Sequence, residues 1–155
     1  MIVWLNGAFG VGKTTVAREL LNIVPNARLA DPERIGYVMR RTFWRNADYQ
    51  DIELWRRLTQ VQVRSAGRTA VAVVPMTITS RRLFDEVTRE ARVFLLAATR
   101  HTIESRITRS AEARAWRSSQ LDRCLEAFGS GEFGEVVDTD GRHPVEIASA
   151  IAARL

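Results

Sequence analysis

A glycine-rich stretch near the N-terminus constrains this chain more than any other feature. Residues 7–14 read Gly-Ala-Phe-Gly-Val-Gly-Lys-Thr, which fits the P-loop pattern of Gly, four residues and then Gly-Lys-Thr. An apolar run at residues 2–5 precedes the stretch, and Val16, Leu20 and Ile23 follow it at helical spacing. Strand, glycine loop and helix in this order are the context that the pattern requires, so the stretch predicts a phosphate-binding loop.

The residue types in this loop explain its chemistry. Glycines let the backbone point its N–H groups inward and approach a phosphate chain, and the N-terminus of the next helix adds positive potential. Lys13 is expected to reach the β- and γ-phosphates, and the Thr14 hydroxyl to ligate Mg²⁺. Lys13 is the single lysine among 23 basic residues, the rest being arginine, which fits a position that needs a compact ammonium. The predicted nucleotide-binding residues are Gly7, Ala8, Phe9, Gly10, Val11, Gly12, Lys13, Thr14, Thr15 and, from a later helix, Arg106.

Composition limits the class of protein. A chain of 155 residues with 46% hydrophobic and 26% charged residues predicts a single soluble domain, residues 1–155. The longest apolar run, residues 70–76, is far shorter than the roughly 20 residues of a membrane span. The absence of a signal peptide and the lone Cys124, which we interpret as core packing, suit the cytoplasm. The net charge is +5, but the arginines are dispersed, so no nucleic-acid partner is expected.

Strand and helix patterns alternate along the rest of the chain. Glycine at position 67 is predicted to end a helix, residues 111–117 form an Arg-rich connection, and Ser118 or Ser119 begins the next helix. No turn residue separates a helix from a strand at residues 89–92. Five strands with intervening helices predict a three-layer α/β P-loop fold with an open parallel sheet. Strands are predicted at residues 2–5, 27–30, 69–74, 93–98 and 136–137, and helices at residues 14–23, 31–44, 52–66, 80–90, 102–110, 118–128 and 144–155.

Acidic residues at strand ends are the candidates for catalysis, because ligands of open α/β sheets lie there. The third strand ends at Pro75 without an acid, although P-loop ATPases and GTPases usually hold Mg²⁺ with an aspartate at such a point. This argues against a motor or a GTPase switch. Asp31 follows the second strand and becomes the candidate general base or Mg²⁺ ligand. It also fits the N-cap of the next helix.

Several arginines are candidates for the phosphate and acceptor sites. Arg106 and Arg109 lie on one helix, Arg123 on the next, and Arg114 and Arg117 lie between them. They are expected to neutralise charge as the γ-phosphoryl group moves, with Arg106 and Arg123 favoured, although a solvated helix face is the alternative. The acceptor is expected to contact residues of the two helices that follow the second strand, among which Trp55 fits the core equally well: Asp31, Arg40, Trp55 and Arg56.

Several segments together resemble the bacterial tunicamycin resistance protein family, which is similar to chloramphenicol phosphotransferase and shikimate kinase. The segments are residues 2–14, Asp31-Pro32-Glu33 with Gly36, Leu54-Trp55-Arg56, Val74-Pro75-Met76-Thr77-Ile78 and Gln120-Leu121-Asp122-Arg123-Cys124. The resemblance implies a nucleotide-kinase-like fold with strand order 2-3-1-4-5, ATP binding, and a lid around residues 110–118 that is shorter than in the family. It implies the roles given above for Lys13, Thr14, Asp31, Arg106 and Arg123.

Two functions fit these features. The first is transfer of the ATP γ-phosphoryl group to a hydroxyl of a small molecule, with Asp31 as the proton acceptor. The second is ATP-dependent binding that sequesters a drug without transfer, which the missing acid after the third strand leaves open. The acceptor is expected to be tunicamycin, by resemblance, or another nucleoside- or sugar-like compound.

Overall fold

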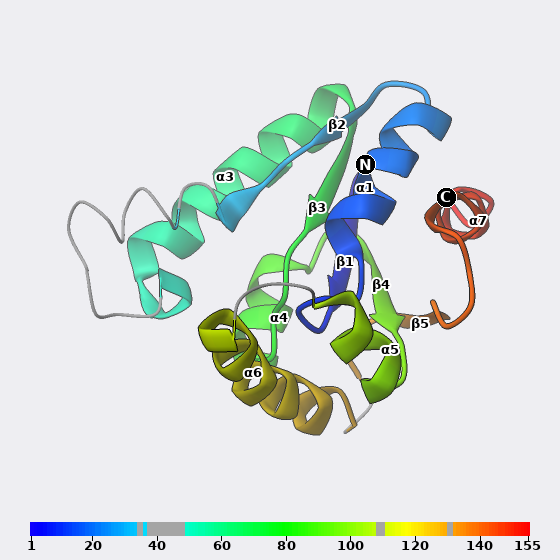
Figure 1. Ribbon diagram of the computed structural model, residues 1–155. Coiled ribbons are helices and arrows are strands. Elements are labelled where there is room, and N and C mark those ends of the chain that lie inside the picture. Colours follow the sequence, from blue (N-terminus) through cyan, green and yellow to red (C-terminus); the bar gives the residue numbers. More distant parts are fainter. Residues whose placement is uncertain (34–35, 37–48, 108–110, 130–131) are drawn as a thin grey trace.

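One parallel sheet lies at the centre of the computed structural model (Figure 1). The structure describes residues 1–33, 36, 49–107, 111–129 and 132–155, and gives the backbone alone for Tyr49 and residues 111–119. The described strands are β1 (Ile2–Gly7), β2 (Ala27–Leu29), β3 (Val71–Pro75), β4 (Ala91–Ala97) and β5 (Glu135–Asp138). Their order across the sheet is β2-β3-β1-β4-β5.

Helices connect these strands. They are α1 (Lys13–Ile23), the 3₁₀ turn η1 (Tyr49–Asp51), α3 (Glu53–Thr69), α4 (Arg81–Val87), α5 (Arg100–Arg106), α6 (Ala111–Gly129) and α7 (Pro144–Ala152). Pro32, Glu33 and Gly36 are also helical, while most of the helix predicted at residues 31–44 lies outside the described residues. In the part of the chain that the structure describes, no helix is long and apolar enough to span a membrane.

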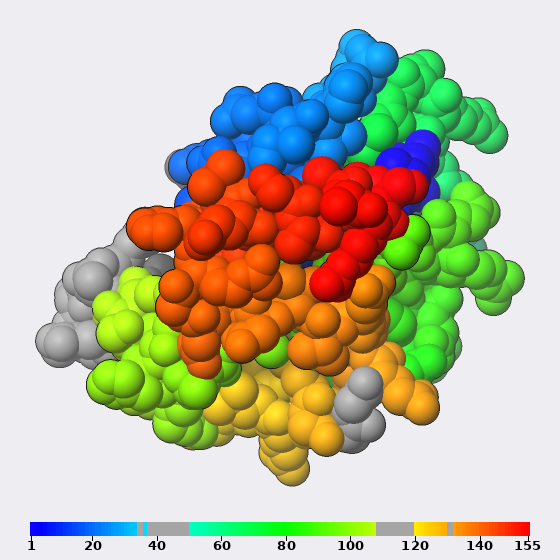
Figure 2. All heavy atoms as spheres, turned by 90° about the vertical axis from the view of Figure 1, so that its right-hand side faces the viewer, coloured from blue at the N-terminus to red at the C-terminus, as the bar shows by residue number. Residues whose placement is uncertain are grey.

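Helices α1 and α7 cover one face of the sheet. Val3 and Leu5 of β1 share a buried cluster with Val16 and Leu20 of α1 and with Ile151 of α7. Figure 2 shows α7, in red, lying across the surface beside α1, in blue. Successive side chains of a strand point to opposite faces, so the side chain of Trp4, between Val3 and Leu5, packs on the other side of the sheet.

Helices α3 and α4 cover the opposite face. Ile2 and Trp4 of β1 share a second buried cluster with Trp55 of α3 and Phe84 of α4. Burial on both faces explains why β1 is an uninterrupted apolar run in the sequence. The predicted α/β fold and the strand order 2-3-1-4-5 are confirmed.

Helix α3 continues to Thr69, so the prediction that it stops at Gly67 is wrong. A Cβ atom at Gly67 would lie 2.8 Å from Cγ1 of Ile2 and 3.3 Å from the carbonyl oxygen of Met1. The Met1 ammonium donates a hydrogen bond to the Gly67 carbonyl oxygen. The glycine therefore allows the start of β1 to approach the helix closely, and the helix ends where Ala70 becomes extended.

The segment predicted as an Arg-rich connection is helical. Residues 111–117 belong to α6, which runs unbroken to Gly129, so the predicted helix start at Ser118 or Ser119 is wrong. Residues 111–117 contain mainly alanine, glutamate and arginine, which favour helix, and neither glycine nor proline. A lid role for this region stays a prediction. Arg109 and the side chains of Arg114 and Arg117 lie outside the described part of the structure.

The junction between α4 and β4 is a tight turn. The helix ends at Val87 and the strand begins at Ala91. The backbone N–H of Ala91 donates to the Thr88 carbonyl oxygen at 2.8 Å, and Thr88 Oγ1 donates to the Phe84 carbonyl oxygen at 2.7 Å. The threonine hydroxyl thus closes the helix end where the sequence has no glycine, proline or asparagine.

Candidate functional site

The P-loop, residues 7–14, joins β1 to α1 at the carboxyl edge of the sheet. Gly10 and Gly12 have φ values of 86° and 107°, in the left-handed region that favours glycine. Gly7 has a φ of 141°, and a Cβ atom there would lie 2.6 Å from the carbonyl oxygen of Leu96 on β4. The loop therefore requires glycine for both conformation and space, and the strand-loop-helix context predicted for it is present.

The ammonium group of Lys13 lies within this loop. Its Nζ donates to the carbonyl oxygens of Gly7 at 3.0 Å and Ala8 at 2.9 Å, and it lies 5.5 Å from the centroid of the Phe9 ring. Burial lowers the pKa of Lys13 to about 8, against the opposing effect of the Glu33 charge. The loop therefore places a cation beside backbone N–H groups that could bind the same anion.

The start of the P-loop is attached to the segment after β3. The buried Asn6 accepts at Oδ1 from the backbone N–H groups of Gly7 and Ile78, both at 2.9 Å, and its Nδ2 donates to the Ile78 carbonyl oxygen at 3.1 Å. Thr77 Oγ1 donates to the Gly7 carbonyl oxygen at 2.8 Å. Residues 74–78, Val-Pro-Met-Thr-Ile, therefore hold the loop in position.

We expect Asn6→Ala to lower the free energy of unfolding by about 2–4 kcal/mol, because it leaves the buried N–H groups of Gly7 and Ile78 without their acceptor. Urea denaturation measures the loss. Thr79→Ala is the control, since Thr79 lies outside this hydrogen-bond network, and it should change stability by less than about 0.5 kcal/mol. A loss at Asn6 as small as that of the control would show that the network does not support the loop.

Arg106 lies against the other side of the loop. Its guanidinium donates to the Val11 carbonyl oxygen at 3.0 Å, and to the carbonyl oxygen and hydroxyl of Thr139 at 3.0 and 3.2 Å. The helix that carries it, α5, begins after the N-cap Thr99, whose backbone N–H donates to the Asp140 carboxylate. The carboxylate that follows β5 therefore supports the helix that carries Arg106.

A cavity of about 400 Å³, which we call the P-loop cavity, lies over the loop. Gly7, Ala8 and Val11 position its cations through their backbones. The carbonyl oxygens of Gly7 and Ala8 accept hydrogen bonds from Lys13, and that of Val11 accepts one from Arg106. The P-loop cavity thus brings together most of the predicted phosphate-binding positions. Its lining residues are Phe9, Gly10, Gly12, Lys13, Thr14, Thr15, Glu33, Pro75 and Arg106.

Glu33 is a candidate that the sequence interpretation missed. It lines the P-loop cavity with Lys13, and burial raises the pKa of its carboxyl group, although the Lys13 charge acts in the opposite direction. Asp31, the predicted base, accepts at Oδ1 from the Glu33 backbone N–H at 3.0 Å, as an N-capping residue does. The sequence contains a pattern that could have indicated Glu33, because two acids, Asp31 and Glu33, flank Pro32 directly after a strand.

Trp55 lies in the core. Its side chain is fully buried, and its Nε1 donates to the Pro32 carbonyl oxygen at 3.1 Å. Of the two interpretations that the sequence left open, the structure supports core packing. Trp55 acts on the site indirectly, because it holds the turn between Asp31 and Glu33.

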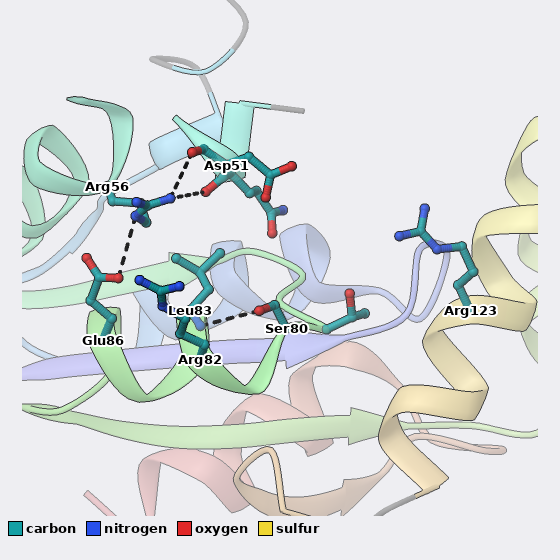
Figure 3. A pocket seen from close by; sticks show the side chains of 9 residues that line it. Asp51, Arg56, Ser80, Arg82, Leu83, Glu86 and Arg123 are labelled. Carbon is teal, nitrogen blue, oxygen red and sulfur yellow. Dashed lines mark hydrogen bonds and ion pairs between the residues drawn. The ribbon is translucent and has the colours of Figure 1, made fainter. Parts of the chain in front are cut away.

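A second cavity of about 470 Å³, which we call the arginine cavity, is lined by residues of α3, α4 and α6 and by the segment that follows β3 (Figure 3). Pro75 lines the P-loop cavity, and Thr79 and Ser80 line the arginine cavity. Arg56 and Arg123, predicted for the acceptor and for catalysis, both line the arginine cavity, while Arg40 lies outside the described residues. The lining residues are Gln50, Asp51, Arg56, Thr79, Ser80, Arg82, Leu83, Glu86 and Arg123.

Comparisons with known proteins identify solved structures that share this fold. Protein-family models and curated proteins yield no match to the chain. Among solved structures, the tunicamycin resistance protein of Deinococcus radiodurans is 28% identical, with a TM-score of 0.79 over 99% of this chain and 94% of that chain. A shikimate kinase from Acinetobacter baumannii, in complex with shikimate, is 16% identical, with a TM-score of 0.70 over 97% and 89% of the two chains. A gluconokinase from Sinorhizobium meliloti is 15% identical, with a TM-score of 0.70 over 98% and 91%.

The chain has the fold of the P-loop kinases. Its structural similarity to a tunicamycin resistance protein confirms the resemblance noted in the sequence. Within this P-loop kinase fold, β3 ends at Pro75, and the residues that follow it contribute hydroxyl groups and not a carboxylate. Among the described residues, Glu33, after β2, is the acid that lines the P-loop cavity, and Asp31, which accepts from the Glu33 backbone N–H, does not line it.

Proposed function

We propose that the protein transfers the γ-phosphoryl group of ATP to a hydroxyl group of a small molecule. The observation that carries this proposal is a pair of cavities that contact the segment 75–80 at different residues, one containing the P-loop with Lys13 and the other lined by arginines. This arrangement suits a phosphate donor and a separate acceptor. Solved structures with the same fold include a sugar kinase, a shikimate kinase and a gluconokinase, which supports a small-molecule acceptor.

In this proposal, different residues bind the phosphates, accept the proton and offset the charge of the transferred group. Lys13 and the backbone N–H groups of the P-loop would bind the β- and γ-phosphates, with Arg106 adding positive charge beside them. The acceptor oxygen forms a bond to the γ-phosphorus, the bond from that phosphorus to the β-γ bridging oxygen breaks, and ADP leaves. The hydroxyl proton passes to Asp31, and Arg123 would offset charge from the arginine cavity as the phosphoryl group moves.

Magnesium would have Thr14 as its protein ligand. The Thr14 side chain is exposed in the P-loop cavity. Among the described residues, no group of three or more His, Cys, Asp or Glu could hold a metal ion by itself. This suits Mg²⁺, which commonly binds phosphate oxygens and water with few protein ligands. When bound with ATP, the ion would neutralise part of the phosphate charge.

ATP-dependent binding without transfer is the second candidate. The absence of a carboxylate at the end of β3 favours it, because many P-loop ATPases hold magnesium there. This function predicts tight, stoichiometric binding of a drug-like ligand in the presence of ATP, with no modified product. Formation of more than one equivalent of phosphorylated product would exclude it.

Mass spectrometry tests the proposed transfer. The protein is incubated with Mg-ATP and either tunicamycin or a set of sugar and sugar-acid acceptors. A product heavier by one phosphoryl group, absent with Lys13→Met protein, would support the kinase function. An acceptor that binds with ATP yet stays unmodified would favour the binding protein.

We expect ATP affinity to fall as the pH rises above about 8. The pKa of Lys13 is lowered to about 8 by burial, so above this pH the free protein must take up a proton to bind the phosphates with a charged ammonium. The dissociation constant should then rise by up to about tenfold per pH unit. The phosphates do not contribute, because their last proton leaves near pH 6.

Calorimetric titration of ATP between pH 7 and pH 9.5 measures this dependence. Lys13→Met protein is the control, and its weaker binding should not vary over this range. A dissociation constant that is independent of pH in the unmodified protein would show that the Lys13 charge does not contribute to ATP binding.

A further inference from the structure

We propose that the arginine cavity binds a carboxylate or phosphate group of the acceptor, so that the acceptor is an anionic molecule that also carries hydroxyl groups. This inference rests on the proposed function and specifies its acceptor. It is carried by the positions of Arg56, Arg82 and Arg123, which reach one cavity from α3, α4 and α6 (Figure 3).

Arg56 is held in a defined orientation. Its Nη1 donates to the backbone carbonyl oxygens of Gln50 at 3.2 Å and Asp51 at 2.9 Å. Its Nε lies 3.5 Å from Oε2 of Glu86, and its side chain is only 21% exposed. The Glu86 carboxylate offsets part of the Arg56 charge, and the two backbone carbonyl oxygens set the position of the guanidinium before a ligand arrives.

Arg82 and Arg123 have no hydrogen-bond or ion-pair partner among the described residues, and both are exposed. Arg81, the neighbour of Arg82 in the sequence, pairs instead with Asp85 and Glu132 outside the cavity. Figure 3 shows Arg123 extending from α6 toward the cavity, across from Arg56. Two guanidinium groups are therefore available to an anion in the cavity.

The charges and the size of the cavity favour a small anion. Its lining contains three arginines and two carboxylates, Asp51 and Glu86, and the Glu86 carboxylate already lies beside Arg56. A guanidinium forms paired hydrogen bonds with carboxylates and phosphates, and a neutral ligand would leave this charge without a partner. The volume of about 470 Å³ suits a molecule of the size of a sugar acid. The hydroxyl group of Thr79 could bind the polar remainder of such a ligand.

Calorimetry with matched ligands tests the inference. The full chain is first saturated with Mg²⁺ and β,γ-methylene-ATP, which occupies the P-loop and prevents transfer. Gluconate is then compared with glucose, and glycerol 3-phosphate with glycerol. We expect at least one anion to bind about tenfold or more tightly than its neutral partner, as charge-assisted hydrogen bonds would produce. The pair with the larger ratio identifies carboxylate or phosphate as the group bound.

Arginine variants locate the binding site. Arg82→Gln and Arg123→Gln should each weaken binding of the preferred anion by about tenfold or more and leave that of the neutral partner unchanged. Arg81→Gln is the matched control, because Arg81 lies next to Arg82 on α4 but outside the cavity. This variant should not change the affinity for the anion. Circular dichroism melting confirms that each variant is folded.

The outcomes separate this inference from the proposed function. Equal affinities within both pairs, no binding of either anion, or an anion preference that survives both cavity variants would overturn the anion site. Transfer to an uncharged acceptor such as tunicamycin without any anion preference would overturn it too, and would leave the kinase function standing. Anion binding without transfer from ATP would support the site and contradict the kinase function.

Discussion

Lys13→Met is expected to lower kcat/KM for phosphoryl transfer by about 100- to 1,000-fold, the usual cost of removing one preorganised donor to a reacting charge. The ammonium is placed by the carbonyl oxygens of Gly7 and Ala8, and the chain contains no other lysine that could replace it. A coupled assay for ADP with the acceptor found by mass spectrometry measures the loss. Activity above about a tenth of the unmodified protein would contradict the role of Lys13.

Two further variants separate the charge of Lys13 from its shape. Arg18→Met removes an exposed cation from the same helix and should leave activity within about twofold, as is usual for surface substitutions. Lys13→Arg keeps the charge but replaces a compact ammonium by a planar group that does not fit the two carbonyl oxygens in the same way. We therefore expect Lys13→Arg to lose most of the activity. Full activity of Lys13→Arg would show that charge alone is sufficient.

Asp31→Asn is expected to lower kcat by about 100-fold or more while ATP affinity changes little. The amide oxygen of asparagine can still accept the hydrogen bond from the Glu33 backbone N–H, so the start of the helix should be preserved. The amide cannot take up the acceptor proton. Single-turnover measurement of product formation, with ATP binding followed separately by calorimetry, distinguishes the two effects.

Glu33→Gln is the informative comparison, because Glu33 lines the P-loop cavity beside Lys13. Asp138→Asn is the control for loss of a strand-end acid, since Asp138 accepts from the Asp140 backbone N–H beyond β5. Normal transfer by Asp31→Asn together with loss of transfer in Glu33→Gln would move the role of base from Asp31 to Glu33. Normal transfer by both variants would contradict a carboxylate base in this turn.

Local patterns in the sequence predicted the parts of the fold that depend on near neighbours. The strand before the P-loop, the glycines at positions 10 and 12 and the helix after it form one continuous segment, so their structure follows from adjacent residues. Buried central strands were recognisable because both faces of the sheet are covered, which requires uninterrupted apolar runs. The cap at Ser80 was predictable for the same local reason.

Errors arose where a distant contact decided the structure. Glycine is a residue type that often ends helices, but Gly67 instead leaves room for Ile2, which lies 65 positions earlier in the chain. Asn6 was unremarkable in the sequence, because its partner Ile78 comes 72 positions later. The error at residues 111–117 had a local cause instead: these residues were predicted as a connection for their arginine content, although arginine favours helix.

The sequence by itself determined the P-loop, the alternation of strands and helices, and hence a sheet edge at which phosphates could bind. Only the tertiary structure decided that Glu33 lies with Lys13 in one cavity, that Trp55 is buried, and that Arg56, Arg82 and Arg123 share a second cavity. The physical reason is that a cavity is lined by side chains from separate elements. Their meeting depends on how α3, α4 and α6 pack around the sheet, which no local pattern in the sequence records.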